Sequence, residues 1–291
     1  GTDWLGLITR NGHIQEHNVN LQGGSQNTQY MVSFNYYDHK GIIRNSGMKR
    51  YTMKTNIDQK FLDIFKAGMN LTLTRIDNDN TQLGDGNFEN SGIIRSAIQM
   101  GPNIKAYDEE TGTYPINPLL GSQPNPYSLL NNTDKGRTDR LLGNVFVEAR
   151  PLEGLVLRVN AGIDHAAINR STYQPRTTLN GYNLNGVAYI YNTANNQYLM
   201  EGTATYQRTF ADIHNLNLLA GVSYEKFNYD ASELGNNNFI TDAFLYNNIE
   251  AGTGNKIVKS DATENKMLSY FFRAGYVLKG RYLLTATLRA D

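Results

Sequence analysis

Apolar and polar residues alternate along several segments of this chain, and these segments come in pairs joined by tight turns. The clearest pair is Leu141–Arg150 and Leu155–Asp164, in which Val145 shares one side with other apolar residues while Asn144 lies opposite. Alternation of this length predicts two β-strands. The connector, residues 151–154, supplies the proline and glycine that tight turns favour. We therefore predict a β-hairpin here.

The same pattern recurs along the whole chain. Further strand-like segments are Tyr30–Tyr36, Met69–Thr74, Tyr198–Gln207, Leu216–Tyr224, Tyr270–Tyr276 and Tyr282–Leu288. We count about ten strands, most of them near the length that crosses a bilayer at a tilt. Tight turns alternate with long polar segments, which are Asp38–Lys49, Asp77–Arg137, His165–Asn196 and Asn228–Asn265. The pattern predicts an all-β, antiparallel up-and-down meander with two unlike ends, as in a partial transmembrane β-barrel.

A soluble antiparallel sandwich would also alternate apolar and polar residues. Three features favour the barrel: the strands exceed the usual five or six residues or so of globular sheets, aromatic residues lie near strand ends, and loops segregate strictly by length. Residues 282–291 stop inside a strand pattern, so we expect a fragment. For a fragment, the missing N-terminal signal peptide carries little weight.

The long segments carry most of the remaining pattern. Ile93, Ile94, Ala97 and Ile98 recur at helical spacing, which predicts one short loop helix within Asn90–Met100. The chain that follows is rich in proline and tyrosine, and we expect it to form an ordered lid.

Composition argues against several classes of function. The chain has 291 residues, 27 Lys+Arg against 27 Asp+Glu, and no cysteine. A neutral chain gives no reason to expect nucleic acid, and the absence of cysteine excludes disulfides and thiol chemistry. No apolar run reaches the roughly 20 residues that a membrane helix needs.

Candidate chemistry is sparse. Asp77 and Asp79, with Asp85 and Glu89 downstream, suggest a calcium loop, but Gln82 stands where the EF-hand requires glycine. A looser calcium site within residues 77–89 stays open.

The other motifs are weaker still. The cluster Gly84-Asp85-Gly86 lacks the strand-before, helix-after setting of a phosphate loop and is interpreted as a turn. His13 and His17 would share one face of a strand, with Glu16 on the other. No nucleophile elbow or HExxH motif is present. We expect no enzyme, no metal site and no cofactor.

Several motifs carry a family resemblance. They are His17–Gly24, Tyr30–Tyr37, Gly41–Tyr51, Arg140–Asn144 and Gly280–Asp291. Together they resemble barrel segments of the SusC/RagA family of TonB-dependent transporters of Bacteroidetes. The resemblance implies an outer-membrane importer of oligosaccharides or peptides, with a barrel of about 22 strands and a plugged lumen. It also implies a SusD-like surface lipoprotein as lid and energy from the TonB complex.

In this interpretation residues 1–291 are part of the barrel domain. The plug domain and the C-terminal strands are expected to lie outside it, the long loops are extracellular, and the location is the bacterial outer membrane. Two sets of site residues follow. The lumen-lining candidates are Asn70, Asn144, Glu148, Arg158, Asn160, Glu201 and Thr203. The substrate-binding candidates are Tyr107, Tyr114, Tyr127, Tyr173, Tyr182, Tyr189 and Tyr191.

Alternatives remain at this point. Each loop tyrosine could serve loop packing instead of contacting sugar, peptide or the lid. The chain could also be a non-transporting adhesin or glycan-binding module, whose apolar faces would pack against each other, or a passive porin without a plug.

Overall fold

A computed structural model describes residues 1–80, 92–121 and 123–291. The strands are β1 (His13–Gly24), β2 (Thr28–Lys40), β3 (Gly47–Phe61), β4 (Phe65–Asp79), β5 (Thr133–Leu152), β6 (Leu155–Gln174), β7 (Val187–Phe210), β8 (His214–Asn237), β9 (Ile257–Leu278) and β10 (Tyr282–Ala290). The helices are α1 (Trp4–Ile8), α2 (Ile93–Gln99) and α3 (Leu179–Asn183), with 3-10 turns η1 (Ser128–Asn131) and η2 (Ile249–Ala251). No helix in the described ranges has the length and apolar character needed to cross a membrane.

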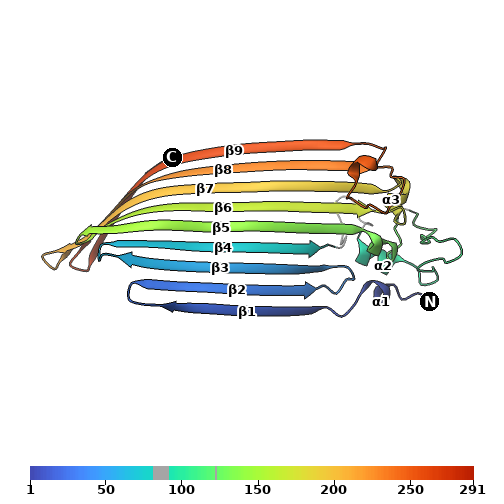
Figure 1. The fold of residues 1–291 in the computed structure, drawn as a ribbon, viewed down its shortest axis with the longest axis horizontal. Helices are drawn as coiled ribbons and strands as arrows, with labels where there is room; N and C mark the ends of the chain where they lie inside the picture. Colours follow the sequence, from blue (N-terminus) through green and yellow to red (C-terminus); the bar gives the residue numbers. More distant parts are fainter. Residues whose placement is uncertain (81–91, 122) are drawn as a thin grey trace.

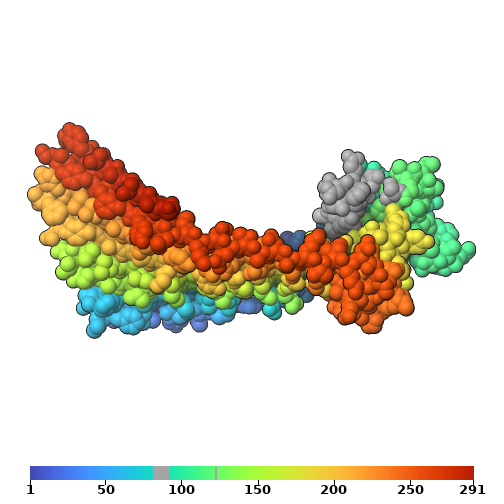
Figure 2. All heavy atoms as spheres, turned by 90° about the horizontal axis from the view of Figure 1, so that it is seen from above, coloured from blue at the N-terminus to red at the C-terminus, as the bar shows by residue number. Residues whose placement is uncertain are grey.

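The strands form one antiparallel sheet in which every strand pairs with its neighbours in sequence, from β1 to β10 (Figure 1). The predicted up-and-down meander is therefore confirmed. Within the described residues the sheet stays open, with β1 and β10 at its two edges. Figure 2 shows the sheet bowed along its length, with the longer connections gathered into a thick head at one end.

Short turns join β1 to β2, β3 to β4, β5 to β6, β7 to β8 and β9 to β10, all at the end of the sheet away from that head. Two of these turns place glycine in the left-handed region, at Gly154 (φ 81°) and Gly280 (φ 66°). Glycine adopts this conformation without steric cost. The turn that the sequence predicted at residues 151–154 is shorter in the structure, at 153–154, because β5 continues to Leu152.

The strands are longer than the sequence suggested. β6 and β7 pair without interruption from Leu155↔Tyr206 to Gln174↔Val187. Much of the segment His165–Asn196, which we expected to be loop, is thus paired strand. The backbone ladder continues there although both faces carry polar side chains, and a segment without apolar alternation gives no strand signal in the sequence.

The two faces of the sheet differ sharply. One, here called the apolar face, carries Leu71, Val145, Val159, Met200 and Val222, which lie side by side or nearly so in the register. Val145 is 50% exposed and Met200 is 59% exposed. A soluble sandwich would cover such residues with a second apolar layer, and the described residues form a single sheet with no such layer.

The opposite surface is here called the polar face. Phe146, Glu148, Ser223 and Ser269 all lie on it, and all are buried even though no second sheet covers them. Side chains converge on the inside of a curved sheet and spread apart on its outside. The polar face is therefore the concave one.

The largest buried core lies in the head, beyond the sheet. Trp4 and Ile8 of α1 pack with Ile93, Ala97 and Met100 in and beside α2. The indole of Trp4 also donates a 3.0 Å hydrogen bond to the carbonyl of Gly101. The helix predicted within Asn90–Met100 is confirmed as α2. No sequence pattern predicted α1 or α3, since five residues are too few for a helical period to show.

The side chain of Asn125 links several backbone segments of the connection between α2 and β5 by hydrogen bonds. Its amide nitrogen donates to the carbonyls of Ala106 (3.1 Å) and Pro115 (2.8 Å). Its amide oxygen accepts from the backbone nitrogens of Tyr127 (2.9 Å) and Ser128 (3.3 Å). Because Asn125 is 1% exposed, this segment folds around a fully satisfied buried amide.

Candidate functional site

The predicted lumen-lining residues share one surface. Register pairs Asn70 with Asn144, Glu148 with Arg158, and Asn160 with Glu201, while Arg158 also pairs with Thr203 on the next strand. Directly paired residues of antiparallel strands point to the same side. All of these side chains therefore lie on the concave polar face.

Hydrogen bonds join some of these residues across strands. The amide of Asn70 donates to Asn144 at 3.4 Å, and the amide of Asn144 donates to Asn160. Glu148 forms an ion pair with Arg150 of the same strand, with 2.9 Å between the guanidinium nitrogen and the carboxylate oxygen. The result is a polar lattice across β4, β5 and β6.

Phe146 is an aromatic residue on this polar surface. Its ring lies under the guanidinium of Arg158, at 4.0 Å, and near the ammonium of Lys66, at 5.5 Å. A cation over an aromatic face is attracted by the ring's quadrupole. The ring thus fits the polar face and is 7% exposed.

The predicted loop tyrosines separate into distinct groups. Tyr107, Tyr114 and Tyr127 gather in the connection before β5, with ring centroids 4.9 Å apart for Tyr107 and Tyr114 and 6.1 Å apart for Tyr114 and Tyr127. Tyr182 lies on α3 and is 74% exposed.

Tyr173 is a correction to the candidate set. It is 0% exposed, packs against Phe239, and lies on the apolar side of β6. Burial raises the pKa of its phenol, and the hydroxyl donates to Asp242 at 2.7 Å. A ligand cannot reach this ring, so Tyr173 serves loop packing.

Tyr189 and Tyr191 lie on the polar face of β7, near the head. Their rings stack with centroids 5.8 Å apart and planes 16° apart. The ring of Tyr189 lies over Gly235 of the neighbouring strand, where a Cβ would come within 2.8 Å of it. The glycine therefore leaves the space that the first ring occupies, and the two rings form a fixed aromatic surface.

Charged residues flank this aromatic pair. The register runs across the polar face from Arg170 to Tyr191, Glu233 and Lys259. Arg170 donates to Asp134 at 2.9 Å, and Lys259 donates to Glu233 at 3.1 Å. We call this set, with Tyr189, the mouth row.

Electrostatics keep the mouth row in defined protonation states. The hydrogen bond to Asp134 raises the pKa of Arg170, which stays cationic. Burial, aided by the charge of Glu233, raises the pKa of Tyr191, so its phenol stays neutral. The row can therefore offer aromatic faces, a hydroxyl and charges of both signs.

The sequence analysis did not predict the charged members of the mouth row as site residues, because Arg170 and Glu233 fall in segments that it assigned to loops. One signal would have found them. Counting by twos from the polar position Asn160 along its strand leads to Arg170, and counting back from Glu201 leads to Tyr191. The same count from Ile163 places Tyr173 on the other side.

In the structure, the two described aspartates of the candidate calcium site form ion pairs with basic residues. Asp77 pairs with Arg137 at 2.8 Å and Asp79 with Lys135 at 3.6 Å, both on the apolar side of the sheet. Asp85 and Glu89, like the Gly84–Gly86 cluster, lie outside the described residues. Among residues 1–80, 92–121 and 123–291 no three acidic or histidine side chains gather to hold a metal ion.

Comparison with known proteins adds independent information. No protein-family model matches the chain. TonB-dependent receptor P3 of Formosa agariphila is 30% identical over 100% of this chain and 29% of its own length. TonB-dependent receptor SusC of Bacteroides thetaiotaomicron is 27% identical over 100% of this chain and 30% of its own length. The chain thus spans less than a third of these curated relatives.

Solved structures agree on the fold. The RagAB peptide transporter structure matches with a TM-score of 0.79 at 20% identity, over 99% of this chain and 32% of that chain. The ferric citrate transporter FecA matches with a TM-score of 0.51 at 9% identity, over 97% of this chain and 38% of that chain.

The open meander, its exposed apolar face and these matches define the class: the chain is a segment of the β-barrel of a TonB-dependent receptor, a bacterial outer-membrane protein. Within that class it is similar to SusC and shares its fold with the RagAB transporter structure.

Proposed function

We propose that this chain, residues 1–291 of a barrel domain, forms wall and substrate-facing surface of an importer of oligosaccharides or peptides. The apolar face meets lipid, and the polar face lines the lumen. The observation that carries the proposal is the mouth row, which joins stacked aromatic rings to paired charges at the head end of the polar face. The relatives named above are receptors, and we assign no catalytic step to this surface.

The mouth row suits a substrate that offers flat apolar surfaces and polar edges. Tyr189 and Tyr191 present amphipathic rings that stack on sugar rings or peptide side chains. Arg170 and Glu233 flank them with a donor and an acceptor for hydroxyls, carboxylates or peptide amides. Both substrate classes fit this chemistry.

Partners follow from the position of this row. We place a SusD-like lipoprotein over the head end, where the exposed Tyr182 and the cluster of Tyr107, Tyr114 and Tyr127 would meet it or the substrate. Energy would come from the TonB complex through a plug domain outside this chain. The polar lattice around Asn144 would then border the path beside the plug.

The adhesin alternative receives no support from the sheet. It requires apolar faces packed together in a closed core, whereas Val145 and Met200 lie on a single exposed surface.

The test uses the complete receptor in its own host. A strain lacking the gene is grown on a panel of single polysaccharides and protein digests, and a nutrient on which growth fails identifies the substrate class. Restoration by the wild-type gene is expected. If every nutrient supports the deleted strain as well as the parent, the importer proposal is wrong.

Variants then test the mouth row. Tyr191→Ala should raise the half-saturating nutrient concentration roughly twofold to tenfold, since one aromatic contact contributes about 0.5–1.5 kcal/mol. Tyr198→Ala is the matched control, because Tyr198 lies on the same strand but on the apolar face. Equal effects of both variants would contradict the assignment of Tyr191 to the substrate path.

A further inference from the structure

The apolar face is not uniform along its length. It is apolar beside the tight turns, becomes aromatic at Tyr36 and Tyr51, whose ring centroids lie 5.2 Å apart, and then becomes charged toward the head. Two adjoining hollows follow this sequence of side chains. Together they are here called the outer groove.

The lower hollow, about 780 Å³, is lined at its base by Phe34, Met53, Leu73 and Leu141. Phe34 is 46% exposed and Met53 is 43% exposed. Register places all four on the apolar face, in line with Val145 and its neighbours. The base of the outer groove is therefore continuous with the lipid-facing surface.

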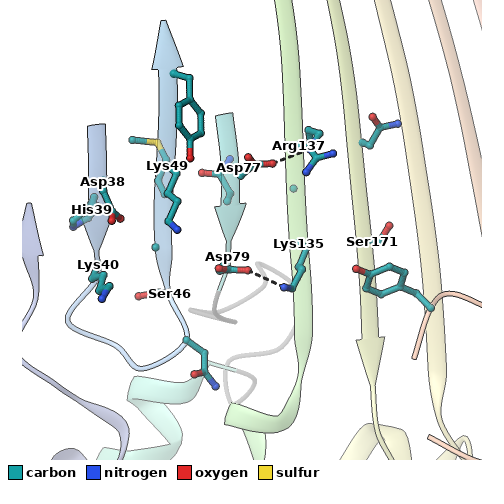
Figure 3. A pocket seen from close by; sticks show the side chains of 18 of the residues that line it. Asp38, His39, Lys40, Ser46, Lys49, Asp77, Asp79, Lys135, Arg137 and Ser171 are labelled. Carbon is teal, nitrogen blue, oxygen red and sulfur yellow. Dashed lines mark hydrogen bonds and ion pairs between the residues drawn. The ribbon is translucent and has the colours of Figure 1, made fainter. Parts of the chain in front are cut away.

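The upper hollow, about 910 Å³, lies on the same side but has charged walls (Figure 3). It shares Tyr51, Asp77 and Arg137 with the lower hollow. The close view shows Arg137 paired with Asp77, and Lys135 paired with Asp79, on neighbouring strands.

Three other cations in the upper hollow, Arg10, Lys40 and Lys49, form no ion pair within 4.0 Å among the described residues. One further carboxylate, Asp38, also lines this hollow and lies opposite Lys49 in the register, so five cations face three carboxylates there. The guanidinium of Arg10 instead donates to the carbonyls of Gly41 (3.0 Å) and Ser46 (2.6 Å), which fix its position. Lys40 and Lys49 are exposed on β2 and β3. The outer groove thus holds a local excess of positive charge directly above an apolar base.

We propose that the outer groove binds a phosphorylated glycolipid of the outer leaflet. Its acyl chains lie over Phe34, Met53 and Leu73, its sugar lies against Tyr51, and its phosphate meets Lys40, Lys49 and Arg10. The order of chemistry along the groove, from apolar through aromatic to cationic, is the order along such a lipid. Continuity with the lipid-facing surface favours a lipid over a protein as the occupant.

The test measures lipid retained by the complete receptor. The receptor is purified in mild detergent, its bound phosphorylated glycolipid is measured by mass spectrometry, and purified lipid A is then titrated onto delipidated receptor. The double variant Lys40→Glu/Lys49→Glu should bind lipid A at least about tenfold more weakly, since each basic side chain near an anionic surface contributes on the order of fivefold.

Lys54→Glu provides the matched control. Lys54 is exposed on β3, like Lys49, but register places it on the polar face, paired with Ser33 and Thr72. It should bind lipid A as the wild type does. Heat-modifiable migration on gels reports that each variant retains a folded barrel.

Two further probes separate the sources of binding. Lipid A stripped of phosphate should bind weakly, and inorganic phosphate should not compete at millimolar concentration because it lacks acyl chains. Equal binding by the double variant and the wild type, or undiminished binding of the dephosphorylated lipid, would overturn the proposal. So would a protein found covering the groove in place of lipid.

Discussion

The hydroxyl of Tyr173 donates a 2.7 Å hydrogen bond to a carboxylate oxygen of Asp242. This bond joins the end of β6 to the connection between β8 and β9, two segments that are far apart in sequence. Asp242 also accepts from Arg176 at 3.2 Å, and the ring of Tyr173 packs edge-on against Phe239. A small core thus ties two connections of the head together.

Tyr173→Phe should loosen that tie without removing the ring. A buried oxygen that loses one donor costs about 1 kcal/mol, and Arg176 limits the loss. We expect faster amide hydrogen exchange in residues 238–256 of the complete receptor. Tyr182→Phe is the control, since its ring is 74% exposed, and it should leave exchange unchanged. Unchanged exchange in Tyr173→Phe would show that Phe239 packing alone holds the tie.

The assignment of faces makes a sharper prediction. Val145→Arg places a cation near the middle of the lipid-facing surface and should lower the free energy of folding into bilayers by about 2–4 kcal/mol. Asn70→Arg, on the adjacent strand but on the polar face, should change it by less than about 1 kcal/mol. The measurement is reversible urea unfolding of the complete receptor in lipid vesicles. A larger cost for Asn70→Arg would reverse the assignment.

Phe146 and Arg158 should prove energetically coupled. The cation lies 4.0 Å from the ring centroid, and such contacts contribute about 0.5–2 kcal/mol. We expect a double-mutant cycle of Phe146→Leu and Arg158→Gln to give a coupling free energy in this range. Purely additive losses would mean that the two residues act only through separate packing contacts.

Acid should weaken the ion pairs beyond the lipid-facing surface. The hydrogen bond from Arg75 lowers the pKa of Asp139 below its ordinary value. Its stabilising effect is therefore present above the unfolded pKa of about 4 and is lost as the pH falls through the lower, folded pKa. Asp139→Asn should flatten the acid side of a plot of unfolding free energy against pH. Coincident curves for variant and wild type would show that the pair contributes nothing measurable.

How far the sequence predicted the structure depended on local signals. Period-two alternation placed Asn70, Asn144 and Glu148 on one face correctly, because one apolar residue in two marks a lipid-facing strand. The same rule lost the strands beyond that surface, where Arg170 and Tyr191 lie in a ladder with polar residues on both sides. There the backbone hydrogen bonds continue, but the side chains show no apolar alternation from which a strand could be predicted.

Long-range contacts were harder still. Tyr173 and Tyr189 look alike in sequence, yet one is buried against Asp242 and the other stacks on the polar face. The core around Trp4 depends on α2, close to a hundred residues away along the chain. No local pattern encodes such a partner.

The uninterrupted register also bears on assembly. β7 and β8 pair residue by residue from Val187↔Asn237 to Phe210↔His214. A slip by a single residue would exchange the two surfaces along the entire hairpin, turning Glu201 toward lipid and Met200 toward water. The free-energy penalty of a misaligned register is thus summed over dozens of side chains at once. The hairpin therefore favours its correct register strongly during insertion.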